Sequence, residues 1–184
     1  MTILPTILVF LVAILAIFWE AAGHGLRHLL GAQIDLLPPL VVYAALNTEL
    51  FTTTALAVIG GLLFDSLSAN PLGVTVMPLF IVGFFIHTRR GLILREERFA
   101  QFTLGLGASA LVPVMTVLLL LTLGTEPLLD WGSLWQWIVM SLGGAALTPA
   151  LFFIFDWLQY ALGYQRVTET SFRPDREIRR RRRT

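Results

Sequence analysis

The sequence predicts an all-α polytopic membrane protein, a six-helix transmembrane bundle in which the second span is short or re-entrant. Two observations lead to this fold class. Of the 184 residues, 56% are hydrophobic and only 14% are charged, whereas a soluble domain of this size needs far more charge to cover its surface. Apolar runs also recur along the chain between short polar breaks, and most approach the length that crosses about 30 Å of hydrocarbon.

The first two runs differ in length. Residues 3–19 have no basic segment before them and no small-residue cleavage site after them, so they predict a retained anchor rather than a signal peptide. The second run covers only residues 36–46, about 16 Å of helix, and opens with Pro38 and Pro39. Both prolines are best placed in the first helical turn, where no N–H is needed. This run is either a short tilted span or a re-entrant segment.

Four longer runs follow, and they cover residues 50–64, 72–88, 99–123 and 134–155. Pro78 is expected to bend the fourth span, and Pro149 lies inside the sixth. Small residues four positions apart let helices approach closely in lipid and so predict a compact bundle, although spans rich in Ala and Gly also contain such pairs by chance. The pairs are Ala57/Gly61, Gly105/Ser109, Ser141/Ala145 and Gly144/Thr148.

Charge is segregated along the chain. Residues 1–163 carry five Arg against nine acidic residues, whereas residues 164–184 carry eight Arg against three. We therefore divide the chain into a transmembrane domain, residues 1–163, and an Arg-rich cytoplasmic tail, residues 164–184, which has no apolar periodicity and is predicted to be disordered. Short Arg-rich loops stay in the cytoplasm, so both termini are predicted to be cytoplasmic. The arginines that set this topology or contact anionic lipid are Arg89, Arg90, Arg95, Arg98, Arg179, Arg180, Arg181, Arg182 and Arg183.

The composition excludes several kinds of chemistry, and we expect no catalytic, cofactor or metal site. The chain has no Cys and no Lys, which excludes thiolate ligands, Walker A loops and Schiff-base enzymes. Glu20, His24 and His28 share a helix face without the spacing of zinc hydrolases, and we interpret them as an interfacial amphipathic turn. A serine nucleophile in an intramembrane protease needs a histidine on a later helix to take its proton, and no histidine follows Ser109. We therefore interpret Ser109 as a packing residue. Consecutive arginines without interleaved aromatic residues do not favour nucleic acid as a partner.

Asp65 ends the third span at a polar segment. It can end one helix, Asn70 can cap the next, Pro71 suits its first turn, and Gly73 allows backbones to approach. An ionisable residue at a span boundary is also a candidate for function. Two interpretations stand: a helical hairpin, which accounts for all these residues and is favoured, and a ligand or partner contact.

Three motifs carry a resemblance to a known family. Residues 34–46 read IDLLPPLVVYAAL, residues 60–65 read GGLLFD, and residues 70–73 read NPLG. Together with a Gly-containing span that ends in Arg89 and Arg90, this order resembles MreD, the rod shape-determining membrane protein family of bacteria. The motifs cover residues 34–90, size and span number agree over the transmembrane domain, and the Arg-rich tail is a departure. The residues implicated as a partner surface or structural hairpin are Asp35, Pro38, Tyr43, Gly61, Asp65, Asn70, Pro71 and Gly73.

The resemblance implies a non-enzymatic scaffold without a cofactor, located in the bacterial inner (plasma) membrane. Such a scaffold belongs to the cell-elongation machinery that maintains rod shape and lateral peptidoglycan synthesis. Its partner would be MreC, a single-span protein, and through it MreB filaments, RodA and the RodA transpeptidase. An alternative is a small-molecule (vitamin-type) binding subunit of a transporter, with Asp35, Asp65 and Asn70 closing over the ligand. That alternative needs several polar residues in the spans to meet at one cavity, and the spans hold few.

Overall fold

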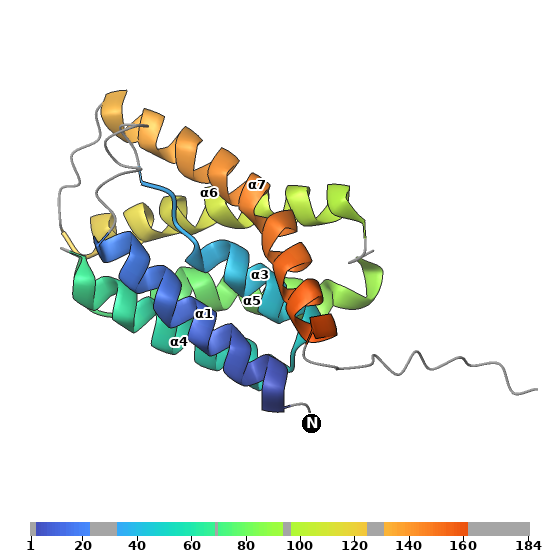
Figure 1. The fold of residues 1–184 in the computed structure, drawn as a ribbon. Helices are drawn as coiled ribbons and strands as arrows, with labels where there is room; N and C mark the ends of the chain where they lie inside the picture. The colour runs from blue at the N-terminus through green and yellow to red at the C-terminus, as the bar shows by residue number, and fades with distance from the viewer. Residues whose placement is uncertain (1–2, 23–32, 69, 94–96, 125–130, 162–184) are drawn as a thin grey trace, which may run out of the picture.

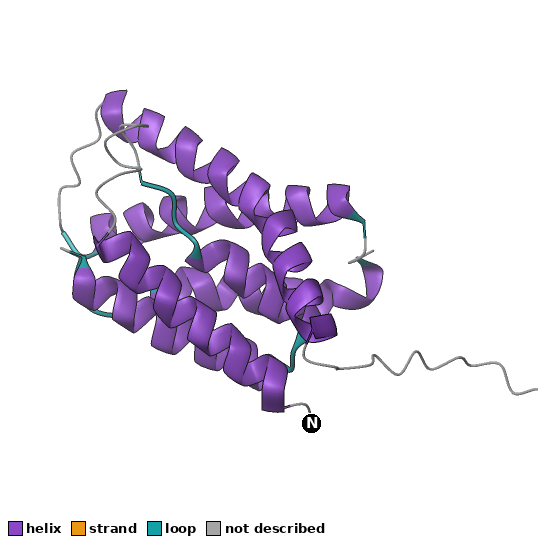
Figure 2. Ribbon diagram, in the orientation of Figure 1, coloured by secondary structure: helices purple, strands orange, loops and turns teal. Residues whose placement is uncertain are grey.

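The computed structural model describes residues 3–22, 33–68, 70–93, 97–124 and 131–161. All regular secondary structure in these ranges is helical (Figure 2), which confirms the all-α prediction. A short 3-10 helix, η1 (Arg90–Leu92), follows α5. The α-helices are α1 (Ile3–Ala22), α3 (Leu37–Asn47), α4 (Leu50–Leu67), α5 (Val76–Arg89), α6 (Arg98–Thr122) and α7 (Trp131–Ala161).

Three of the described helices, α4, α6 and α7, are long and apolar enough to cross a membrane. This number is smaller than the six predicted spans. Helix α3 has 11 residues and α5 has 14, which correspond to about 16 Å and about 21 Å of helix, less than the thickness of the hydrocarbon core. Helix α5 is shorter than the predicted span because it begins at Val76 and not at Leu72.

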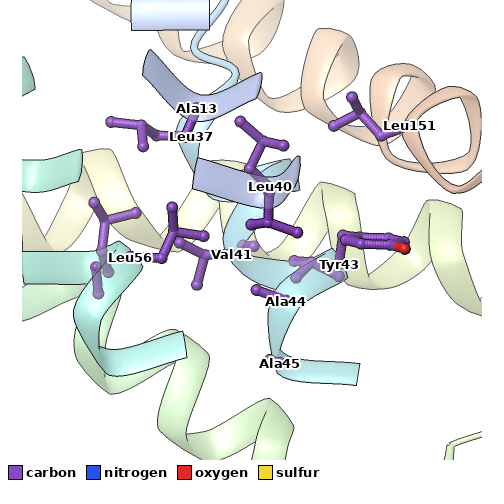
Figure 3. Close-up of a cluster of buried hydrophobic side chains, with 14 of the residues drawn as sticks. Ala13, Leu37, Leu40, Val41, Tyr43, Ala44, Ala45, Leu56 and Leu151 are labelled. Carbon is purple, nitrogen blue, oxygen red and sulfur yellow. The ribbon is translucent and has the colours of Figure 1, made fainter. Parts of the chain in front are cut away.

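Helix α3 lies in the middle of the bundle and contacts all the other α-helices described (Figure 1). Its residues 37–46 are all buried, as expected for a helix that is apolar on every side. Leu40 and Val41 point to different neighbours in this core (Figure 3). The predicted short second span is therefore the centre of the bundle.

Small residues bring α6 and α7 into contact, as their spacing predicts. A Cβ added at Gly105 would lie 2.7 Å from Thr148 Cβ, and one added at Gly144 would lie 2.5 Å from Ser109 Cβ. Real Cβ atoms do not approach other atoms so closely, so each glycine accommodates the hydroxyl residue of the other helix. Ser109 is buried in this contact. Of all the helix pairs, α6 and α7 share the most extensive contact.

The prolines have different effects. Pro38 and Pro39 stand in the first turn of α3, as predicted. Pro78 is the third residue of α5 and also falls in a first turn, so the prediction that it bends the span is wrong. The reason is the later start of α5. In the first turn of a helix an N–H has no partner within the helix, so a proline at position 78 removes no helical hydrogen bond. Pro149 lies inside α7, as expected.

The outer faces of the bundle expose large apolar side chains. On α1, Leu11, Leu15 and Phe18 are each more than half exposed, and on α7 Phe153 is 68% exposed. Exposed apolar surface of this extent indicates contact with lipid or with another apolar surface.

Successive helices run in alternating directions, so their ends gather at two ends of the bundle (Figure 1). Glu20, Asp35 and Asp65 lie at the end where α1 and α4 finish, which we call the acidic end. At the other end, which we call the basic end, α5 finishes and α6 begins. The described basic residues there are His87, Arg89, Arg90 and Arg98, and three acidic residues, Glu49, Glu97 and Asp156, lie at the same end.

Candidate functional site

Asp65 closes the hairpin between α4 and α5. Its side chain is 1% exposed. Oδ2 accepts hydrogen bonds from the backbone N–H groups of Gly73 (2.9 Å) and Thr75 (3.1 Å), and Oδ1 accepts one from the Thr75 hydroxyl. Thr75 precedes α5 and makes no side-chain cap of its own. The carboxylate of one helix therefore caps the N-terminus of the next, where negative charge is stabilising.

Asn70 and Pro71 do not begin the next helix, so that part of the hairpin prediction is wrong. Pro71 is exposed, and the Asn70 N–H donates to Ser68 Oγ at 3.3 Å. The turn continues past Pro71, whose carbonyl accepts a hydrogen bond from the Val74 N–H at 3.4 Å. The start of α5 lies farther along the chain because the Asp65 carboxylate holds the backbone N–H groups that precede it.

Two glycines shape this hairpin in different ways. Gly73 has φ +91°, and a Cβ added there would meet nothing within 4 Å. Its role is therefore the left-handed backbone that the turn requires, and not the close helix contact predicted from the sequence. Gly61 makes that contact, since a Cβ there would lie 2.9 Å from Val76 Cα.

Two carboxyl groups from different elements meet the N-terminus of α3. Asp35 Oδ1 accepts from the Leu37 N–H at 2.9 Å, and Glu20 Oε1 of α1 accepts from the Leu36 N–H. The next two residues are prolines and have no N–H. A buried helix end needs a partner for each free N–H, and this arrangement provides one for each.

Asp35 is almost fully buried, at 4% exposure. Burial raises the pKa of its carboxyl to about 6, and the hydrogen bond from Leu37 opposes that rise. Glu20 is its neighbour, and Glu20 Oε2 is buried without a hydrogen-bond partner among the described residues. Asp35 is therefore uncharged over part of the range in which an ordinary aspartate is ionised.

Tyr43 joins α3 to α7 inside the core. Its ring stacks on Phe155, with centroids 4.2 Å apart, and meets the ring of Phe152 edge-on at 4.9 Å. Its hydroxyl accepts a hydrogen bond from Gln159 Nε2 at 3.0 Å. With 1% of its surface exposed, Tyr43 is a core residue that fixes two helices together.

One residue of α5 and one of η1 bind the C-terminal end of α3. His87 Nδ1 lies 3.0 Å from the Ala45 carbonyl oxygen, and Arg90 Nη1 donates to the Thr48 carbonyl at 3.0 Å. A carbonyl oxygen only accepts, so His87 Nδ1 carries the proton. Sequence reasoning missed the role of His87, because its partner lies 42 residues away. The only local signal was a histidine at the end of an apolar run.

Of the other predicted arginines, the structure describes Arg89 and Arg98. Arg89 is exposed, and its guanidinium lies 5.8 Å from the centroid of the Phe85 ring. Arg98 lines a cavity of about 500 Å³ between α6 and α7, together with Gln101 and Asp156. The remaining predicted residues lie outside the described ranges, as do His24 and His28 of the amphipathic turn. They are Arg95, Arg179, Arg180, Arg181, Arg182 and Arg183.

The described residues contain no group of three or more His, Asp or Glu side chains able to hold a metal ion. The motif residues fall in two places. Asp35 and Tyr43 make contacts of α3, whereas Gly61, Asp65 and Gly73 shape the hairpin between α4 and α5. No family model matches the chain, and no curated protein or solved structure is significantly similar to it.

Proposed function

We propose that the chain is a non-enzymatic integral membrane scaffold of the bacterial cell-elongation machinery, which helps to maintain rod shape and lateral cell-wall synthesis. Its direct partner is an MreC-like single-span protein, through which it connects to MreB filaments, RodA and the RodA transpeptidase. The motif resemblance to MreD supports this proposal, as do the three helices long and apolar enough to cross a membrane.

The observation that carries the proposal is the use of the MreD-like residues inside the bundle. Asp35 and Asp65 bind helix N-termini, Tyr43 packs between two helices, and Gly61 allows α4 and α5 to touch. Residues used in this way fix the positions of helices around α3. A scaffold needs such a rigid centre, because its partners bind an outer surface that must keep a constant shape.

On this proposal the protein is a multi-pass protein of the inner membrane with six spans and cytoplasmic termini. The basic end faces the cytoplasm, as the positive-inside rule requires for Arg89, Arg90 and Arg98. The alternating direction of the helices supports the placement of both termini on one side, since it puts the start of α1 and the end of α7 at the same end (Figure 1). The short helices α3 and α5 then cross with the longer helices around them.

The transporter alternative requires Asp35, Asp65 and Asn70 to face a ligand. Both oxygens of Asp65 already accept hydrogen bonds from Gly73 and Thr75. The cavity that contains Arg98 and Asp156 lies near the basic end and is lined by none of the three residues that the alternative needs. These contacts favour the scaffold.

Depletion of the protein in its rod-shaped host tests the proposal. We expect the cells to become round, and the tagged full-length chain to co-purify with its single-span partner in mild detergent. Gly61→Ala, which pushes α4 away from Val76, should lose both the partner and rod shape. Gly91→Ala is the matched control, because a Cβ there meets nothing within 4 Å. Rod shape that survives depletion, together with lost uptake of a vitamin, would favour the transporter.

A further inference from the structure

The structure contains an apolar groove between α5 and α6, for which the proposed scaffold has no use. We propose that this groove binds one anionic glycerophospholipid, with an acyl chain in the groove and the phosphate beside Arg89 at the basic end. The inference rests on the proposed function in one respect, namely that the basic end lies at a membrane surface.

The groove has a volume of about 350 Å³ and an apolar lining. Thr103 is the one lining residue with a polar side chain, and its hydroxyl donates to the Phe99 carbonyl at 2.8 Å. The groove therefore offers hydrocarbon contact without a free hydrogen-bond donor. A ligand that fits it must present an apolar segment.

Gly107 and Ala108 of α6 are the smallest residues that line the groove. A Cβ added at Gly107 would meet nothing within 4 Å, whereas one added at Gly105 would overlap Thr148 of α7. Gly105 is thus needed for helix contact, and Gly107 leaves open space. The contact between α5 and α6 is also much less extensive than that between α6 and α7.

One end of the groove is positively charged. Because α5 and α6 are antiparallel, Phe85 and Thr103 line the groove towards the basic end, and Ile81 and Leu111 line it towards the middle of the bundle. The guanidinium of Arg89 lies over the Phe85 ring and is exposed. Phe85 lines the groove, so this contact places one positive charge at that end. An apolar groove with a cationic mouth matches the two parts of an anionic lipid.

The size of the groove suits an acyl chain and is too small to enclose a whole helix. A helix with side chains is about 10 Å wide, so its cross-section is about 80 Å². The whole groove, at about 350 Å³, would admit about 4 Å of such a cylinder, or fewer than three residues. An acyl chain is one methylene wide and can lie along the groove.

The test uses the purified full-length chain in nanodiscs that contain phosphatidylglycerol and phosphatidylcholine with identical acyl chains. After detergent extraction and gel filtration, the retained lipid is measured by mass spectrometry. We expect about one retained phosphatidylglycerol per wild-type chain, several-fold more than phosphatidylcholine. Gly107→Leu fills the groove and should abolish this retention with an unchanged melting temperature. Arg89→Gln should remove the preference for phosphatidylglycerol.

Two matched controls separate the groove from general lipid contact and general charge. Ala146→Leu introduces the same side chain at an exposed position of α7 and should retain phosphatidylglycerol. Deletion of residues 175–184 removes six Arg, none of which is needed by the proposed site, and should also retain phosphatidylglycerol. Inorganic phosphate alone should not displace the lipid, because it gains nothing from the groove.

Several outcomes would overturn the inference. A stable Gly107→Leu that retains phosphatidylglycerol contradicts it, as does displacement by inorganic phosphate. If Gly107→Leu keeps the lipid but loses the single-span partner, the groove binds a helix. These lipid measurements do not depend on cell shape. A Gly107→Leu chain that loses the lipid but supports rod-shaped cells would therefore uphold the groove and leave the scaffold proposal standing.

Discussion

Thr75 donates both its backbone N–H and its hydroxyl to the carboxylate of Asp65, ten residues earlier in the chain. This pair fixes the start of α5 to the end of α4. Because the carboxylate also accepts from Gly73, one side chain determines the turn and the first residue of the next helix.

Substitutions of Asp65 should separate the loss of charge from the loss of the acceptor. Asp65→Ala leaves the N–H groups of Gly73 and Thr75 without a partner in a buried place, and should lower the free energy of unfolding by about 2 kcal/mol. Asp65→Asn should cost less, because its oxygen still accepts and its amide can donate to the Thr75 hydroxyl. Unfolding in detergent measures both. A stable Asp65→Asn that loses all function would indicate a charged partner contact.

Glycine substitutions in the hairpin should differ according to the role of each glycine. Gly73→Ala forces a side chain into the left-handed region, at a cost of about 1 kcal/mol. Gly61→Ala should cost more, because its Cβ meets the backbone of Val76, which cannot rotate away. Gly91→Ala is the control and should be neutral. Equal thermal stability for Gly61→Ala and Gly91→Ala would contradict the close contact of α4 with α5.

An exchange of side chains across the contact between α6 and α7 should restore stability. Gly144→Ala introduces a Cβ that overlaps Ser109 and should cost more than 2 kcal/mol, by overpacking. Ser109→Gly removes the overlapping atoms, so the double variant should recover most of the loss. A double-mutant cycle on unfolding free energies measures the coupling. Additive effects of the two substitutions would show that the residues do not touch.

The raised pKa of Asp35 predicts a pH-dependent stability. The folded state binds this proton more tightly than the unfolded state, in which the pKa has its ordinary value of 3.8. Stability should therefore fall as the pH rises from the ordinary pKa of the carboxyl towards its raised value. Asp35→Asn keeps the acceptor for the Leu37 N–H and should reduce this dependence. The melting temperatures of the wild type and of Asp35→Asn are to be measured between pH 4 and pH 8. Parallel curves for the two proteins would show that Asp35 does not cause the pH dependence.

Labelling of single cysteines tests the orientation of the bundle. The chain has no natural Cys, so Ser68→Cys at the acidic end and Glu97→Cys at the basic end each provide one reactive site. In intact cells an impermeant reagent should label Ser68→Cys only. In inverted membrane vesicles it should label Glu97→Cys only. The reverse pattern would show that the positive-inside argument fails for this chain.

Local sequence signals predicted those features that depend on local physics. The prolines of α3 stand in its first turn, and the small-residue pairs lie at the contact between α6 and α7. The start of α5 was predicted wrongly, because Asn70 and Pro71 are good local signals and Asp65 acts from the preceding helix. Likewise, an 11-residue apolar run predicts a short tilted span or a re-entrant segment. The run by itself gives no sign that α3 contacts every other described α-helix, because those contacts come from distant parts of the chain.

The placement of α3 has a consequence for the order in which the protein is made. The N-terminal end of α3 is bound by Glu20, which is synthesised before α3. The carbonyls at its C-terminal end are bound by His87 and Arg90, each of which is synthesised 42 residues after its partner. Until then the nascent chain carries a short helix whose C-terminal carbonyls lack these two partners and which has only some of its neighbouring helices. We therefore expect nascent chains that stop before residue 87 to be recognised by membrane quality-control proteases, and release from the insertion machinery to come only after α5 is complete.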